Sequence, residues 1–205
     1  MTEQKIDMTD IEQLAWAGLV SKGISNSISG LSQMVGQDIK PLALNPEVVE
    51  IIKIPDMIGG AETIAVGVYL RVTGDASGHM VLVYQPKAAF ELLDMLLGLP
   101  AGTTQTIDDM GASALGEMGN IMGSFFLNSL SESTGMVLMP SPPAVMMDMA
   151  GAILNVALAE IMMETDDACI VEATFGTIDQ QVNGVFLVMP SLELLDALRR
   201  KWGSL

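Results

Sequence analysis

The apolar positions of this chain follow a helical period in some segments and alternate with polar residues in others. Spacing near 3.6 residues is typical of a helix with one buried face, and alternation is typical of a half-buried strand. Gly, Pro and Asp residues mark the turns between them. The predicted elements, in chain order, are a helix over 9–35, extended segments over 39–44 and 48–54, a hairpin over 63–73 and 80–84, a helix opening at Pro86, a long helix over 108–133, an extended segment over 136–145, a helix over 147–163, a hairpin over 168–177 and 182–189, and a helix from Pro190 through Lys201.

The long central helix carries signals at both ends. Thr106 is the residue type that caps a helix N-terminus, and Asp108 and Asp109 would lie favourably at the positive end of the helix dipole. Gly135 is expected to end the helix, because glycine adopts the left-handed conformation that closes many helices.

The second half of the chain repeats the order of elements of the first half. Each half has a long helix, an extended piece, a hairpin and a closing helix. The phrase Glu91-Leu-Leu-Asp-Met-Leu96 also recurs as Glu193-Leu-Leu-Asp-Ala-Leu198, shortly after Pro86 and Pro190. The repetition predicts an internal duplication. We therefore expect one domain over residues 1–205, made of two structural repeats at about 9–98 and 106–202.

Composition narrows the classes of partner. The chain has 205 residues, of which half are hydrophobic, so it can supply a sizeable core. It has 9 basic and 25 acidic residues and a net charge of −16. Nucleic acids and anionic membrane surfaces are bound mainly through Lys and Arg, so neither is an expected partner. The sequence lacks a run long enough to span a bilayer and an apolar leader, and its one cysteine, Cys169, cannot form an internal disulfide, which together predict a cytoplasmic protein without membrane insertion.

The central helix also carries the strongest candidate for chemistry. Glu117 and Asn120 lie three residues apart, which places them about 60° apart around a helix and about 4.5 Å apart along it. A carboxylate and a carboxamide placed so can orient a water and grip a cation. Interior glycines at 116, 119 and 123 favour close approach of another backbone or of a partner. The residues alone leave open the alternative that Glu117 and Asn120 are merely solvated and that the glycines serve packing.

The spacing Ser113-x3-Glu117-x2-Asn120-x21-Pro142 resembles the signature of the CheC/CheX/FliY family of chemotaxis phosphatases. The similarity extends to Asn120-Ile-Met-Gly123, to Pro142-Pro143 and to the two-half organisation, so it covers essentially the whole chain. It implies an α/β fold with a pseudo-two-fold repeat, in which a mixed, largely antiparallel sheet carries two long packed helices.

The resemblance also implies a function. Members act on the phosphorylated response regulator CheY, which carries an acyl phosphate on an aspartate and brings its own Mg²⁺. By this resemblance, Asn120 would position a water in line with the phosphorus and Glu117 would pair with the lysine of the response regulator. Ser113 and Pro142 would have supporting parts, in helix-surface contact and in shaping the adjoining loop. This chain would then bind no metal or cofactor of its own, and CheD would be a possible second partner.

One departure from the family pattern keeps an alternative open. CheC proteins typically carry a second Glu-x-x-Asn pair on the first long helix, where this chain reads Leu14-Ala-Trp-Ala-Gly-Leu19. We therefore expect one active site per chain. The alternatives are a non-catalytic CheC-type scaffold that binds CheD, CheY or the flagellar switch, and an adaptor in a different two-component pathway.

Overall fold

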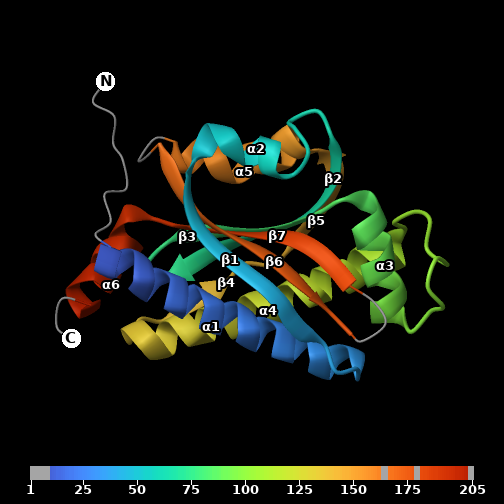
Figure 1. Cartoon of the computed structure of the whole chain (residues 1–205), viewed down its shortest axis with the longest axis horizontal. Coiled ribbons are helices and arrows are strands. Elements are labelled where there is room, and N and C mark those ends of the chain that lie inside the picture. The colour runs from blue at the N-terminus through green and yellow to red at the C-terminus, as the bar shows by residue number, and fades with distance from the viewer. Residues whose placement is uncertain (1–9, 163–165, 178–180, 203–205) are drawn as a thin grey trace.

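A computed structural model describes residues 10–162, 166–177 and 181–202. Its helices and strands alternate in the order shown in Figure 1. The elements are α1 (Asp10–Val35), β1 (Lys40–Glu50), the 3-10 turn η1 (Ile51–Lys53), α2 (Ile54–Met57), β2 (Ile64–Gly74), β3 (Gly78–Tyr84), α3 (Pro86–Leu97), α4 (Asp109–Thr134), β4 (Leu138–Pro140), β5 (Ala144–Met149), α5 (Ala150–Ile161), β6 (Asp167–Gly176), β7 (Gln181–Pro190) and α6 (Leu192–Trp202).

Among the described residues, seven strands form one continuous sheet in which the two halves of the chain interleave. The strand order is β1-β6-β7-β3-β2-β4, and β5 also pairs with β2. Strand β1 of the first half pairs with β6 of the second, while β4 and β5 of the second half pair with β2 of the first. All of these pairings are antiparallel, as is the central pairing of β3 with β7. The predicted α/β fold is therefore confirmed, whereas the duplication itself stays a prediction.

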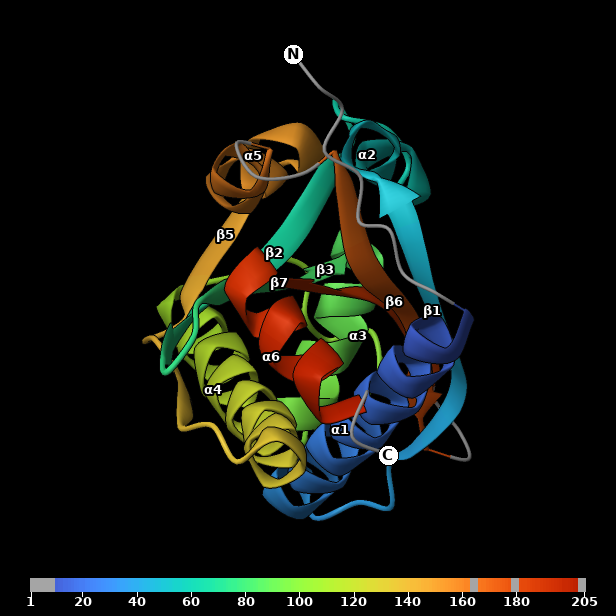
Figure 2. The same ribbon diagram turned by 90° about the vertical axis from the view of Figure 1, so that its left-hand side faces the viewer.

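Each face of the sheet carries its own hydrophobic core. Alternation along β2 directs Val66, Val68 and Leu70 toward α1, α3, α4 and α6, and Ala65 toward α2 and α5. Figure 2 shows α1 and α4 below the curved sheet and α2 and α5 on its opposite side. In the described part of the chain, none of the helices combines the length and the apolar character needed to cross a bilayer.

The two long helices pack against each other through small residues, as expected. A Cβ added at Gly23 of α1 would lie 2.7 Å from the ring of Phe126 in α4, so glycine makes room for the aromatic side chain. The hydroxyl of Ser27 donates a hydrogen bond to the carbonyl of Met122 at 2.7 Å across the same interface. This interface fixes α4, which carries the candidate site, against the first half of the chain.

The linker between the halves is held by one buried carboxylate. Asp94, near the end of α3, is 1% exposed. Its oxygens accept hydrogen bonds from the backbone N–H groups of Gly102, Thr103 and Thr104 at 2.7, 3.0 and 2.8 Å. These bonds satisfy the carboxylate and fix the path that the chain takes into α4.

Several predicted boundaries were wrong. Pro190, predicted to open the last helix, is instead the last residue of β7, where it is paired with Gly78, and α6 begins at Leu192. The predicted extension through residue 54 ends at Glu50, and Pro55 instead lies in the first turn of α2. Pro41 and Pro46 lie within β1, which an edge strand tolerates. Residues 147–149 extend β5 rather than opening a helix, because they pair with β2. The N-terminal boundary predicted at residue 9 lies outside the described residues.

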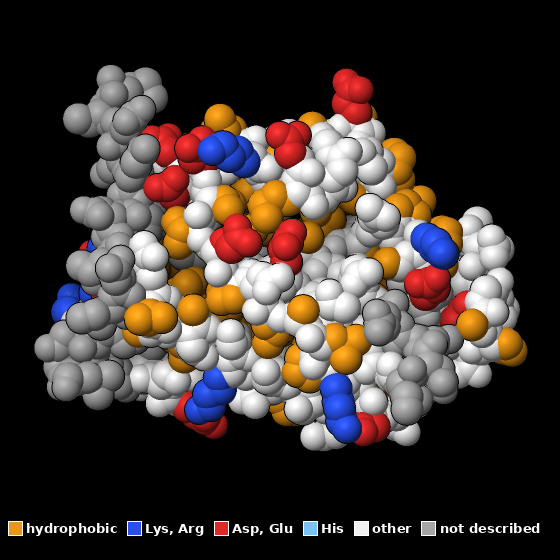
Figure 3. Space-filling view, in the orientation of Figure 1, with side chains coloured by type: hydrophobic (Ala, Val, Ile, Leu, Met, Phe, Trp, Pro, Cys, Tyr) orange, Lys and Arg blue, Asp and Glu red, His pale blue; other side chains and the backbone are white. Residues whose placement is uncertain are grey.

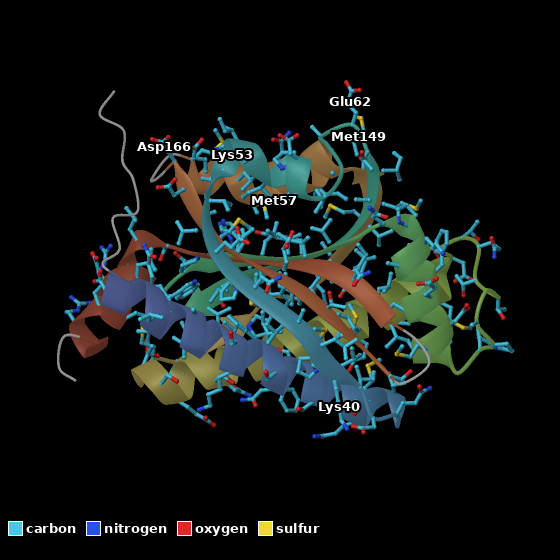
Figure 4. The ribbon with its side chains drawn as sticks, in the orientation of Figure 1. Lys40, Lys53, Met57, Glu62, Met149 and Asp166 are labelled. Atoms are coloured by element: carbon cyan, nitrogen blue, oxygen red, sulfur yellow. The ribbon has the colours of Figure 1, made fainter. Side chains whose placement is uncertain are left out.

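The surface reflects the acidic composition. Several of the basic side chains are already paired with a nearby carboxylate, as Lys40 is with Asp38 at 2.8 Å and Lys53 with Glu50 at 3.2 Å. Both lysines lie on the outside of the molecule in Figure 4, and Figure 3 shows carboxylates spread over the same face. Exposed pairs of this kind contribute little to stability. They do lower the positive charge available to anionic partners.

Candidate functional site

The candidate side chains lie on one outward-facing stripe of α4. Ser113, Glu117 and Asn120 are all exposed, and their spacing of four and three residues keeps them on one side of the helix. The helix begins one residue after Asp108, whose side chain accepts a hydrogen bond from the N–H of Gly111 at 2.8 Å. Asp108, and not the predicted Thr106, is therefore the N-cap. Gly135 ends the helix with φ of 77°, as predicted.

Core packing on the opposite side of α4 determines which way this stripe points. Leu115, Met118 and Met122 are buried against the sheet and α1. Gly119 and Gly123 let the helix approach β2 closely. A Cβ at Gly119 would lie 2.5 Å from Cγ1 of Val68, and one at Gly123 would lie 3.0 Å from Cδ2 of Leu70. The close approach at these two glycines is therefore to side chains of β2, and not to another backbone or to a partner as the sequence suggested.

Gly116 differs from Gly119, and this difference gives a matched stability test. We expect Gly119→Ala to destabilise the fold by about 1–3 kcal/mol, because the added methyl group collides with buried Val68. At Gly116 the nearest atom to an added Cβ is 3.7 Å away, so Gly116→Ala should stabilise the helix by up to about 1 kcal/mol. Urea unfolding of both variants measures this. Equal effects of the two substitutions would contradict the close approach at Gly119.

A proline-rich wall faces the exposed stripe across an open groove of about 640 Å³. Glu117 and Asn120 line one side, and Pro142 lies on the other side, more than 20 residues later in the chain. Ser141 fastens this wall to β2. Its N–H donates to the carbonyl of Arg71 at 2.8 Å, and its hydroxyl oxygen accepts from the N–H of Arg71 at 3.0 Å. The full lining is Asp109, Ala112, Ser113, Gly116, Glu117, Asn120, Pro140, Pro142, Pro143 and Val145.

The structure therefore brings all four predicted site residues to one groove. Sequence reasoning did not assign a place there to Asp109, Pro140 or Val145. Asp109 could have been found from helical spacing, since it lies four residues before Ser113. Val145 could not, because its place follows from the pairing of β5 with β2.

Within the described part of the chain, the side chains of Glu117 and Asn120 make no hydrogen bond or ion pair. The carboxamide of Asn120 thus keeps both a donor and an acceptor for an external group, and the carboxylate of Glu117 keeps its acceptors. No group of three or more His, Cys, Asp or Glu side chains is placed to hold a metal ion anywhere among the described residues. The expectation that this chain binds no metal of its own stays a prediction.

The first long helix lacks the same pair and presents apolar surface instead. Leu14 is 74% exposed on α1, and Gly18 one turn later has open space around it. Trp16 between them is only 2% exposed and belongs to the core shared by α1 and α4. The structure thus places one Glu-x-x-Asn pair, on α4, at a groove.

Comparisons with known proteins agree with this geometry. The sequence model of the CheC-like family matches residues 110–147, which contain Glu117, Asn120 and Pro142. The CheY-P phosphatase CheC of Bacillus subtilis (strain 168) is 26% identical over 180 residues, which is 86% of each chain. The fold is similar to that of Thermotoga maritima FliY, with a TM-score of 0.76, 20% identity and coverage of 97% of this chain and 99% of that one. It is also similar to a chain of the FliG-FliM complex from H. pylori, with a TM-score of 0.65, 15% identity and coverage of 92% and 100%. The matched motif region, the relative that is similar over most of the chain and the shared fold together support the CheC/CheX/FliY family for this chain.

Proposed function

We propose that this chain is a phosphatase that hydrolyses the aspartyl phosphate of a CheY-type response regulator, with a single active site at Glu117 and Asn120. The observation that carries the proposal is the exposure of both side chains, unbonded within the described residues, on one stripe beside the groove. The relative in Bacillus subtilis, a CheY-P phosphatase, supports the same chemistry. Because CheY-type response regulators are cytoplasmic, the proposed activity would take place in the cytoplasm.

The reaction is the attack of water on an acyl phosphate. The O–H of the water forms a hydrogen bond with the carboxamide of Asn120, which holds the water in line with the phosphorus. A new P–O bond forms, the bond from phosphorus to the aspartyl oxygen breaks, and the products are inorganic phosphate and the free aspartate, with the protons of the water passing to phosphate and solvent. Positioning and electrostatics supply most of the acceleration in phosphoryl transfer. The phosphorylated substrate brings its own Mg²⁺ and lysine, so this chain needs only to place the water.

Glu117 has the docking role in this proposal. Its carboxylate accepts a charge-assisted hydrogen bond from the lysine of the response regulator, which lies beside the phosphoryl group. Ser113 contacts the incoming surface from the same stripe of α4. Pro142 shapes the facing wall and keeps the groove open.

Release of inorganic phosphate tests the proposal directly. A CheY-type response regulator is phosphorylated with acetyl phosphate and separated from it, and its dephosphorylation is followed with Mg²⁺ present, with and without this chain. The proposal predicts that phosphate release is faster in the presence of the chain. An unchanged lifetime of the phosphorylated regulator in the presence of the chain would overturn it.

Glu117→Gln should act mainly on binding. The amide keeps the size of the side chain but removes the charge that pairs with the lysine, so the KM for phosphorylated response regulator should rise by about 10-fold. The value of kcat should change less, because Asn120 still orients the water. Steady-state phosphate release over a range of substrate concentrations separates the two constants. Glu132→Gln, on the last turns of α4, is the matched control. A fall in kcat at unchanged KM would contradict the docking role.

A second candidate function is binding without catalysis. It is favoured by the absence of a Glu-x-x-Asn pair on α1 and by the similar fold in the FliG-FliM complex. A scaffold of this kind would bind CheD, a response regulator or the flagellar switch and leave the phosphate lifetime of its partner unchanged. A regulator from another two-component pathway is a further possible partner. Pull-down combined with the phosphate assay distinguishes these outcomes.

A further inference from the structure

An exposed apolar surface lies next to the groove. We call it the methionine patch and define it by four side chains that the core leaves uncovered. Their exposed fractions are large for residues of this type. The members are Ile64 (44% exposed), Met110 (66%), Met147 (49%) and Met149 (46%).

The patch continues the two walls of the groove in the same direction. On β5, Val145 lines the groove, and Met147 and Met149 follow at the spacing that keeps side chains on one face of a strand. Met147 is paired with Val66, whose side chain is buried in the core between the sheet and α4. Met147 therefore lies on the same face of the sheet as α4. Met149 is paired with Ile64. In Figure 4, Met149 lies at the edge of the molecule, where a partner can reach it.

On the other wall, the exposed stripe of α4 also has an apolar side chain in its first turn. Met110 lies three residues before Ser113 and seven before Glu117, so it belongs to the same stripe of the helix. Asp109 beside it lines the groove. From its N-terminal end, the stripe thus presents Met110 first and then the site residues.

The size of a stable complex explains why such a surface is needed. A specific complex usually buries about 800 Å² on each partner, and most of its affinity comes from a few well-packed side chains near the centre of the interface. Glu117 and Asn120 are small polar groups that would be engaged with the phosphoryl site and its lysine. Methionine suits the remaining contact, because its flexible, polarisable side chain adapts to a partner surface.

We infer that the methionine patch is the docking surface for the phosphorylated response regulator itself, and that it supplies affinity while Asn120 supplies rate. This inference rests on the proposed function, since the partner is the one whose phosphate enters the groove. A regulator placed with its phosphoryl site over Asn120 must extend beyond the groove, and the patch lies at the end of the groove where Val145 continues into Met147. The partner surface that fits is apolar and borders the phosphorylated aspartate.

The test compares two double variants of the full chain. Met147→Gln with Met149→Gln makes the patch polar at nearly unchanged volume. Leu14→Gln with Met162→Gln does the same at side chains that are 74% and 54% exposed, on α1 and at the end of α5. Binding is measured by calorimetry with a CheY-type response regulator activated by beryllofluoride and Mg²⁺, and kcat is measured by phosphate release. Thermal melts check that both variants are folded.

The patch variant should bind the activated regulator at least about 10-fold more weakly than the wild type, with kcat at saturation changed by less than about 2-fold. The control variant should bind as the wild type does. Equal binding by the patch variant and the wild type would overturn this inference alone. The inference would also be overturned if the patch joined two copies of this chain. In that case the wild type would be a dimer, and the patch variant would be a monomer that still binds the regulator. Absence of regulator binding by the wild type would overturn the proposed function and this inference with it.

Discussion

Asn120→Ala is expected to slow dephosphorylation at saturating response regulator by about 100-fold or more, which is the scale of losing a preorganised transition-state contact. The methyl group cannot hold a water, and nothing else described on the stripe offers a carboxamide to the phosphoryl site. Binding of the activated regulator should change little, because Asn120 acts on the attacking water. Single-turnover phosphate release with excess enzyme measures the chemical step directly.

Asn128→Ala is the matched control for this prediction. Asn128 is the same residue type on the same helix, is also exposed, and lies eight residues beyond Asn120, outside the groove. It should keep the wild-type rate. If Asn120→Ala and Asn128→Ala both kept that rate while the wild type was active, water positioning by Asn120 would be wrong and another residue would have to supply it.

Asp94→Ala is expected to destabilise the fold by about 3 kcal/mol. The substitution removes a buried charged acceptor and leaves the backbone N–H groups of Gly102, Thr103 and Thr104 without their partner. Because these groups hold the linker that leads into α4, the start of the site helix should loosen as well. Urea unfolding gives the free energy, and hydrogen exchange of residues 102–104 locates the change.

The sequence repeat offers a matched control for Asp94. Asp196 occupies the corresponding place in Glu193-Leu-Leu-Asp-Ala-Leu198, but its side chain is 62% exposed and pairs with Arg199 at 3.3 Å. Asp196→Ala should therefore cost less than about 1 kcal/mol. Similar losses for both variants would show that the linker contacts of Asp94 add nothing beyond a surface ion pair.

The contribution of Asp94 should also depend on pH. Burial by itself raises the pKa of this carboxyl, but the side chain of Thr104 and the backbone N–H groups of residues 102–104 outweigh it and hold the pKa below its ordinary value. A lowered folded-state pKa stabilises the protein above the ordinary value near 4. That stabilisation is lost as the pH falls through the lowered pKa. The stability difference between wild type and Asp94→Ala should therefore shrink below about pH 4.

Features that depend on near neighbours along the chain could be predicted from the amino-acid pattern alone. Signals at both ends predicted α4, with Gly135 marking its end, and alternation predicted the first hairpin. The spacing of Glu117 and Asn120 was enough to place both on one side of a helix. Helical hydrogen bonds and side-chain direction are set within a few residues, so local patterns suffice for such features.

Other features depend on contacts between distant segments and became visible only in the folded chain. Exposure of Asn120 follows from the close seating of Gly119 on Val68, which commits the other side of α4 to the core. The proline-rich wall lies at the site because Ser141 forms hydrogen bonds with the backbone of Arg71, which is 70 residues earlier in the chain. Residues 147–149 are extended because β2 offers hydrogen bonds that outweigh their helical pattern. The groove is thus a product of strand pairing and close packing, which bring together residues whose order in the sequence says nothing of their distance.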